Sequence, residues 1–262
     1  LNAPAGTFTA GTGTVTLDGT ACDSAAHCPL ATANSLNNLN IDDGLVGYWK
    51  FDDGAGRIAK DSSALGNDFT ISNTNLSISS NGKLGSALYF PDGAYNLLNT
   101  GIALGSNVPH TLSFWLKIVD LSDINSYCFP VRKDGINGAS WYITSGGSTL
   151  AYVGRNPVAQ SSISENTWVH LVISVDENKV GTPYINGNAG STVTGDDQSW
   201  VSTIQFNSWT GSTRQHQEAY YDDIRIYNRT LSASEAASLA SSNLTTGSGV
   251  YSLGSALKLT GD

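Results

Sequence analysis

The stretch Thr111-Leu-Ser-Phe-Trp-Leu-Lys-Ile-Val119 alternates apolar and more polar side chains. Successive side chains of a β-strand point to opposite faces of a sheet, so Leu112, Phe114, Leu116 and Ile118 share one face. The stretch Trp168-Val-His-Leu-Val-Ile-Ser-Val-Asp176 has the same pattern, with Val169, Leu171, Ile173 and Val175 on its apolar face. Strands with one apolar and one more polar face are typical of antiparallel sheets packed over a shared core.

Similar short runs recur along the chain, separated by clusters of Gly, Asn, Asp and Ser. This is the pattern of a β-sandwich or barrel, and the Asn186-Gly187 pair is a strong hairpin signal. The segment from Leu231 to Leu239 is the one convincing helix, because Ser232 can cap it and Glu235 completes a capping box. The sequence therefore predicts an all-β, two-sheet antiparallel sandwich with one short C-terminal helix.

The length and the charge of the chain limit the classes of protein to which it can belong. The 262 residues are 40% hydrophobic, which suits one large β domain with extensions better than two small domains. Lys and Arg number 13 against 22 Asp and Glu, and this acidic balance argues against nucleic acid and anionic membranes as partners. No apolar run approaches the roughly 18 residues of a membrane span, so we expect no membrane insertion.

The two ends of the chain differ from its middle. Residues 1–43 form a Thr/Gly-rich β extension, and residues 243–262 form a strand-like tail. Cys22 and Cys28 are close enough in sequence for a small disulfide loop, which we favour over a metal pair completed by His27. The chain begins at Leu1 without a charged and apolar leader, so we expect a processed mature chain or a piece of a longer one.

A series of motifs in the middle of the chain follows the order found in one family of domains. The motifs are Val46-Gly-Tyr-Trp-Lys-Phe-Asp-Asp-Gly-Ala-Gly56, Asp61-Ser-Ser-Ala-Leu-Gly-Asn-Asp68, Lys83-Leu-Gly-Ser-Ala-Leu-Tyr-Phe-Pro-Asp-Gly93, Leu112-Ser-Phe-Trp-Leu-Lys117, Thr167-Trp-Val-His-Leu171, Tyr184-Ile-Asn-Gly187 and Asp222-Asp-Ile-Arg-Ile-Tyr-Asn-Arg-Thr-Leu-Ser232. Residues 44–242 thus resemble the laminin-G-like, or concanavalin A-like, jelly-roll domains of bacterial surface and secreted proteins. The resemblance implies a jelly-roll fold and a secreted or cell-surface location.

The resemblance also implies a structural calcium ion between the early acidic loops and the last strand. Its ligands would be Asp61, Asn67 and Asp222, with Asp53 or Asp52 nearby and backbone carbonyls completing the shell. Strand alternation gives Asp222 the parity of the apolar residues that follow it, so we expect its side chain to lean toward the core. Two alternatives stay open for these acids: hydrogen-bonded pairing of Asp222 with a nearby arginine, and plain turn capping.

Aromatic residues outside the framework strands are the candidate ligand-binding groups. Trp141, Trp200 and Trp209 are expected to face solvent, where their rings could stack on sugars; packing under long loops is the alternative. Trp49, Trp115 and Trp168 fall in framework strands, where packing is the better interpretation. His170 is expected to be a hydrogen-bonded structural histidine.

The sequence gives little support for catalysis. Glycosidases on this general fold use paired carboxylates, whereas the glutamates of this chain are isolated along the sequence. We therefore expect an extracellular, non-catalytic adhesion or carbohydrate-binding module whose partner is a glycan or a surface protein. One alternative is a structural subunit of a filament or surface layer that self-associates by β-strand addition through its terminal extensions. Another is a segment of a long multidomain surface protein.

Overall fold

The computed structural model describes residues 44–241 except 54–55, 64, 72–73, 93–97, 105–107, 123, 125–126, 134–138, 196–201 and 208–217. Residue contacts divide the chain into two compact units, and the unit Gly44–Leu244 contains all the described residues. Outside the described residues lie the two predicted extensions, the Cys22–Cys28 disulfide, Trp200 and Trp209, so these features stay predictions.

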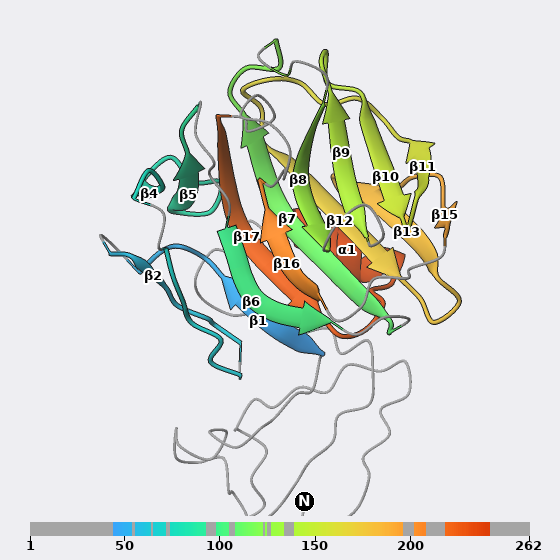
Figure 1. Ribbon diagram of the computed structural model, residues 1–262, viewed down its shortest axis with the longest axis horizontal. Helices are drawn as coiled ribbons and strands as arrows, with labels where there is room; N and C mark the ends of the chain where they lie inside the picture. Colours follow the sequence, from blue (N-terminus) through green and yellow to red (C-terminus); the bar gives the residue numbers. More distant parts are fainter. Residues whose placement is uncertain are drawn as a thin grey trace, which may run out of the picture. The chain divides into compact units, whose positions relative to one another are not determined.

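Most of the described chain forms two antiparallel sheets (Figure 1). The larger sheet has the order β14-β13-β12-β7-β17-β5-β4, with β1 paired to β17 and β15 paired to β13. Its strands are β1 Leu45–Trp49, β4 Ser77–Ser79, β5 Ala87–Phe90, β7 His110–Ile118, β12 Val169–Val175, β13 Val180–Ile185, β14 Asn188–Ala189, β15 Val193–Thr194 and β17 Ala219–Tyr227.

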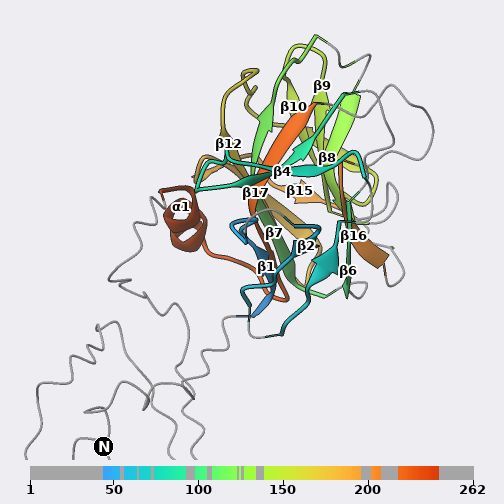
Figure 2. The same ribbon diagram turned by 90° about the vertical axis from the view of Figure 1, so that its left-hand side faces the viewer.

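The smaller sheet has the order β11-β10-β9-β8-β16-β6. Its strands are β6 Leu98–Leu104, β8 Tyr127–Lys133, β9 Ser140–Thr144, β10 Thr149–Val153, β11 Asn156–Ala159 and β16 Ser202–Phe206. A separate short ribbon pairs β2 Ile58–Ala59 with β3 Phe69–Thr70, and the helix α1 spans Ala233–Ser241. The two large sheets form the stacked layers of a jelly-roll sandwich (Figure 2), as the sequence predicted.

The core lies between the two sheets. All the apolar residues that alternation assigned to the inner faces of β7 and β12 are buried. Phe114 of β7 contacts Phe206 of β16 edge to face, with 5.4 Å between ring centroids, and Tyr221 of β17 lies 5.7 Å from Phe206. These contacts join the layers, because Phe206 belongs to the smaller sheet and the other two rings to the larger one.

Strand β17 contains a β-bulge, and it corrects one prediction. Asp222 lies opposite Trp115 of β7, but Arg225 lies opposite Ser113, so β17 has one extra residue between these pairs. Asp223 has a positive φ of 52° at this point. Because the bulge reverses the alternation, Asp222 shares the outer face with Trp115 and does not lean toward the core as its sequence parity predicted.

The bulge also buries an ion pair. The guanidinium of Arg225 lies 2.9 Å from a carboxylate oxygen of Asp223, donates a hydrogen bond to the Tyr48 hydroxyl at 2.8 Å, and stacks 4.3 Å from the Tyr48 ring. The side chains of Arg225 and Asp223 are only 8% and 3% exposed. A charge buried this deeply is tolerated because its partner is fixed beside it.

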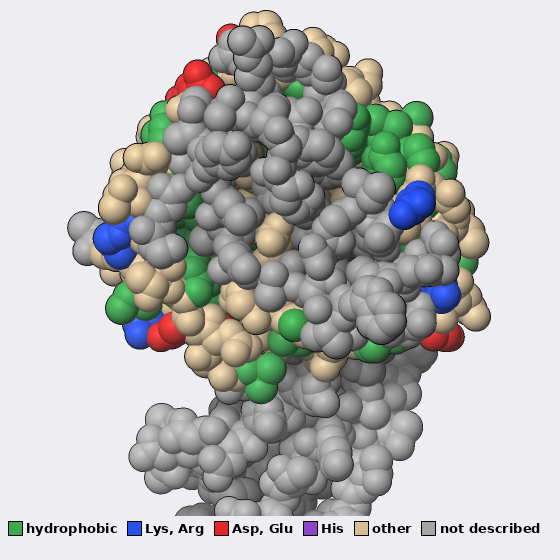
Figure 3. Space-filling model, viewed as in Figure 1, with side chains coloured by type: hydrophobic (Ala, Val, Ile, Leu, Met, Phe, Trp, Pro, Cys, Tyr) green, Lys and Arg blue, Asp and Glu red, His purple; other side chains and the backbone are tan. Residues whose placement is uncertain are grey.

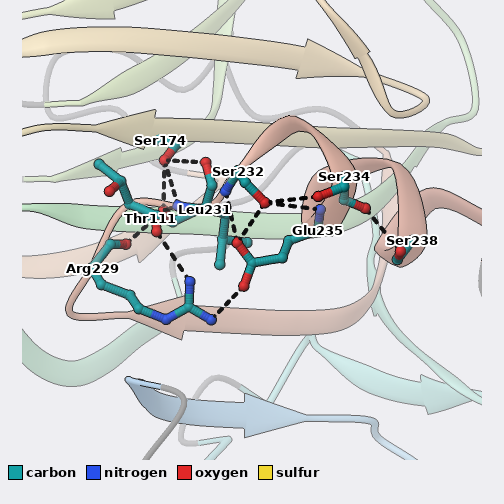
Figure 4. Close-up of polar contacts among 9 residues, drawn as sticks. Thr111, Ser174, Arg229, Leu231, Ser232, Ser234, Glu235 and Ser238 are labelled. Carbon is teal, nitrogen blue, oxygen red and sulfur yellow. Dashed lines mark hydrogen bonds and ion pairs between the residues drawn. The ribbon is translucent and has the colours of Figure 1, made fainter. Parts of the chain in front are cut away.

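The C-terminal helix covers part of the outer face of the larger sheet. The predicted capping box is confirmed: Glu235 N–H donates to Ser232 Oγ at 3.3 Å, and Ser232 N–H donates to Glu235 Oε2 at 2.8 Å (Figure 4). Just before the helix, Leu231 N–H donates to the hydroxyls of Ser174 and Thr111, at 2.8 and 3.1 Å. The helix then packs Ala236 against Val172 and Tyr184, as a buried cluster separate from the main core.

Replacing Asp223 with alanine tests the buried ion pair. Asp223→Ala leaves the Arg225 guanidinium buried without its counter-charge, so we expect the free energy of unfolding to fall by about 3–5 kcal/mol. The control is Asp68→Ala, which removes an exposed ion pair with Lys60 and should cost much less than Asp223→Ala. Urea unfolding of both variants measures the difference, and equal losses would contradict the assigned role of Asp223.

Candidate functional site

A row of side chains crosses the outer face of the larger sheet from β12 to β5. Lys117 of β7 lies opposite Tyr220 of β17, and Tyr220 lies opposite Tyr89 of β5. Trp168, just before β12, joins the row at the other end, where the Lys117 ammonium lies 5.3 Å from its ring. We call Trp168, Lys117, Tyr220 and Tyr89 the aromatic row; all four side chains are half-buried.

The members of the aromatic row hold one another in place. The Lys117 ammonium lies 4.4 Å from the Tyr220 ring centroid and makes a cation–π contact with this ring. The Tyr89 and Tyr220 centroids are 4.8 Å apart, and those of Trp168 and Tyr220 are 6.4 Å apart. Contacts with neighbouring side chains of the sheet therefore hold the rings of the row in place.

A carboxylate marks the end of the aromatic row opposite Trp168. The Tyr89 hydroxyl donates a hydrogen bond to Glu218 Oε1 at 2.7 Å. Burial, followed by the nearby Glu218 carboxylate, raises the pKa of Tyr89 to about 12, so this phenol stays neutral at physiological pH. The row thus runs from an ammonium group beside Trp168 to a carboxylate beside Tyr89.

A second row of side chains lies on the same face of the sheet, two residues away along each strand. His170 lies opposite Trp115, which lies opposite Asp222. We call these residues the polar row, and each is at most 4% exposed. Among the described residues, His170 Nδ1, Trp115 Nε1 and Asp222 Oδ1 have no hydrogen-bond partner. Three buried polar atoms of this kind in neighbouring positions are unusual in a structural sheet face.

The loop before β5 covers the polar row. The Lys83 ammonium lies over the Trp115 ring at 4.7 Å, and Leu84 N–H donates to Asp222 Oδ2 at 2.8 Å. His170 is held by a 3.0 Å hydrogen bond between its Nε2 and the Ser113 hydroxyl, as expected for a structural histidine.

Burial shifts the pKa values of His170 and Asp222, at the two ends of the polar row, in opposite directions. Burial, with a smaller effect of the Arg225 charge, lowers the pKa of His170 to about 3. Burial raises the pKa of Asp222 to about 7; the Leu84 N–H opposes this shift and the Asp223 charge adds to it. His170 is therefore neutral at physiological pH, while Asp222 titrates near it.

The comparisons with known proteins agree with this fold. The family model of the concanavalin A-like lectin/glucanase superfamily matches residues 90–237, more than half of the chain. The chain belongs to this superfamily. A comparison with curated protein sequences found no match.

The chain also resembles several solved structures. The binding domain of Paraclostridial mosquitocidal protein 1 is 22% identical, with a TM-score of 0.58 over 76% of this chain and 52% of that one. The botulinum neurotoxin serotype D binding domain is 17% identical, with a TM-score of 0.51 over 76% and 52%. A Trypanosoma rangeli sialidase is 14% identical, with a TM-score of 0.56 over 77% and 33%. The chain thus spans about half of each toxin domain and a third of the sialidase, and the likeness is one of fold.

The predicted calcium ligands have different hydrogen-bond partners in the structure. Asp61 accepts hydrogen bonds from Tyr48 N–H at 2.8 Å and from Asn67 N–H at 2.7 Å, so these two predicted ligands do lie together. Asp53 instead accepts from Lys60 N–H at 3.1 Å, and Asp222 lies at the polar row. In the part of the chain that the structure describes, no three His, Cys, Asp or Glu side chains are grouped for a metal ion.

The predicted sugar-stacking tryptophans need one correction. Trp141 is fully buried, because the alternation of β9 places it on the inner face beside Ile143, so its ring cannot stack on a ligand from solvent. Its neighbour Tyr142 instead faces outward and lies 5.5 Å from Tyr152 of β10. Figure 3 shows hydrophobic side chains gathered where β10 and β11 lie.

The aromatic row itself was missed by the sequence analysis. Trp168 was assigned to framework packing, and Tyr89 and Tyr220 were not singled out. The signal was present for Trp168 and Tyr89, which have outward parity. Tyr220 instead has the sequence parity of the core-facing Ile224 and Ile226, and only the bulge turns it outward. These signals could not be combined without the pairing of β12, β7, β17 and β5, which no single stretch of sequence reveals.

The polar row predicts opposite pH dependences for two variants. Unfolded His170 binds its proton near pH 6.5 but folded His170 only near about 3, so this residue makes the folded state lose stability as the pH falls through that window. Folded Asp222 keeps its proton up to about pH 7 while unfolded Asp222 loses it near 3.8, so Asp222 makes the folded state lose stability as the pH rises.

We therefore expect His170→Gln to become less stable from about pH 4 to 7, and Asp222→Asn to become more stable, each by a few kcal/mol. Urea unfolding in the presence of a chelator measures both trends, with the parent chain giving a flatter profile because the two effects oppose each other. Two variants with the same slope as the parent would contradict the assigned burial.

Proposed function

We propose that this chain is an extracellular, non-catalytic adhesion module that binds carbohydrate on the aromatic row. The observation that supports this most is the arrangement of Trp168, Tyr220 and Tyr89 across neighbouring strands, with Lys117 between two of the rings. Aromatic rings supply the apolar surface that the C–H faces of sugars contact, and polar groups beside them fix the orientation of the hydroxyls.

The position of the row on a sheet favours binding without rearrangement. Its side chains come from strands that are paired along most of their length, and their rings contact one another. A ligand would therefore cost little ordering of the protein, which matters because each immobilised side chain costs about 0.5–1.5 kcal/mol on binding. The two toxin domains of similar fold are described as binding domains, which supports a binding role.

The positions of the glutamates support a non-catalytic role. A glycosidase needs one carboxylic acid and one carboxylate roughly 5–10 Å apart across the scissile bond. Glu235 instead caps α1 and pairs with Arg229, Glu218 accepts from Tyr89, and Glu165 accepts from Leu121 N–H at 3.4 Å. Each of these carboxylates already has a structural contact. Filament assembly through the terminal extensions rests on residues outside the described ones and stays a prediction.

Single aromatic replacements test the proposed site. Trp168→Ala and Tyr220→Ala each remove a ring of the aromatic row, and we expect glycan affinity to fall at least about tenfold, or about 1.4 kcal/mol. The control is Tyr142→Ala, which removes a half-buried ring from the outer face of the smaller sheet. A glycan array identifies the ligand, and calorimetry then measures the affinity of each variant.

A loss of binding in Tyr142→Ala with full affinity in Trp168→Ala would place the site on the smaller sheet. A parent chain that binds no glycan on the array would remove the carbohydrate-binding proposal altogether.

We also propose that calcium stabilises the fold, with Asp222 as its principal protein ligand. Its buried Oδ1 has no hydrogen-bond partner among the described residues, and such an oxygen suits a hard cation. The other predicted ligand, Asp61, uses both carboxylate oxygens for hydrogen bonds within its own loop, one from Ser63 N–H at 2.8 Å and one from the Ser63 hydroxyl at 2.6 Å. Asp222 therefore fits the ion better than Asp61.

Calcium addition after chelation should raise the melting temperature of the parent chain by several degrees, since a ligand that binds only the folded state stabilises it. Asp222→Asn should lose this increase, whereas Asp61→Asn should keep it at a lower starting temperature. A calcium response that survives in Asp222→Asn and disappears in Asp61→Asn would show that the ion sits in the early acidic loop.

A further inference from the structure

We infer that the carbohydrate bound on the aromatic row is acidic, with a sugar carboxylate that pairs with Lys117. This inference rests on the proposed function, because it names the ligand class of the same site. Its basis is the state of the Lys117 ammonium, which is held between two rings and is not ion-paired with any described carboxylate.

Three other cations of the described chain are paired with carboxylates. Arg225 pairs with Asp223 at 2.9 Å, Arg229 with Glu235 at 2.7 Å, and Lys60 with Asp68 at 2.6 Å. In a chain with a net charge of −9, carboxylates are plentiful. Lys117 nonetheless lies over the rings of Trp168 and Tyr220, where its charge is only partly compensated and its N–H groups keep their capacity to donate.

The neighbouring row repeats this arrangement. Lys83 lies over Trp115 at 4.7 Å, also without a carboxylate of the described residues as a partner. Trp115 precedes Lys117 by two positions on the same face of β7, a separation of about 7 Å along the strand. Two ammonium groups on aromatic rings thus occupy one part of an otherwise acidic protein, which favours an anionic ligand.

A carboxylate gains more from this site than a neutral hydroxyl. A carboxylate adds the attraction between opposite full charges to the hydrogen bond from the ammonium, which a neutral hydroxyl does not. The rings on either side of Lys117 also limit the conformations of its side chain, so little entropy is lost when the pair forms. Specificity for an acidic sugar follows from a group that is already in position.

The opposite end of the row selects against a second negative charge. Glu218 lies beside Tyr89, where its carboxylate can accept a hydrogen bond from a sugar hydroxyl and would repel a ligand carboxylate. The four strands that carry the row span about 14 Å, long enough for an oligosaccharide. The acidic sugar would therefore lie at Trp168 and Lys117, and a neutral sugar or hydroxyl face at Tyr89 and Glu218.

Matched polymers test this ligand class. Calorimetry measures the binding of polygalacturonate, alginate, hyaluronate and polysialic acid, each beside its methyl-esterified form, with polyglutamate as an acidic chain that carries no sugar. We expect at least one carboxylated glycan to bind, at least tenfold more tightly than its ester and more weakly as salt is added. Lys117→Gln should abolish that difference, Lys117→Arg should keep most of it, and the control Lys60→Gln should leave it unchanged.

The outcomes separate this inference from the proposed function. Equal binding of neutral and acidic glycans that depends on Trp168 would overturn the acidic ligand and leave carbohydrate binding standing, and so would a preference that survives in Lys117→Gln. Binding of polyglutamate as tight as that of the glycans would show that charge alone is recognised, which also overturns the inference. No binding to any glycan, acidic or neutral, would overturn both.

Discussion

The β-bulge at Asp222 and Asp223 in β17 is the constraint on which the outer face of the larger sheet depends. It reverses the alternation of β17, so that Tyr220 and Arg225 both face outward while Tyr221 and Ile224 both face the core. Without the extra residue, one half of this strand would carry its apolar side chains to the wrong face. The bulge also lies where β5 and β1 meet along one edge of β17.

Several functional features follow from this one irregularity. Asp223 is turned to the Arg225 guanidinium, and Asp222 is left on the outer face, where it receives the Leu84 N–H and binds the covering loop to the sheet. Asp223 adopts a positive φ at the bulge, a conformation that costs of order 1–3 kcal/mol, and its carboxylate is held there by the Arg225 guanidinium. A strained backbone position that is held by several contacts is often found beside a functional site.

Local sequence patterns were enough to predict the architecture and the helix. The alternation of β7 and β12 correctly assigned their inner faces, and Ser232 with Glu235 marked the start of α1. The pattern was insufficient for Asp222, because an extra residue in a strand leaves no mark on its composition. Trp141 was assigned to the surface although the same period-two rule places it beside Ile143 in the core. The aromatic row required the order of four strands, which depends on contacts between distant parts of the chain.

The central claim is that the outer face of the larger sheet, and not that of the smaller one, recognises carbohydrate. A crystal structure of the chain with its tightest oligosaccharide tests this directly. We predict sugar rings lying across Trp168, Tyr220 and Tyr89, within hydrogen-bond distance of Lys117. A ligand bound instead over Tyr142 and Tyr152, with the aromatic row unoccupied, would contradict the account.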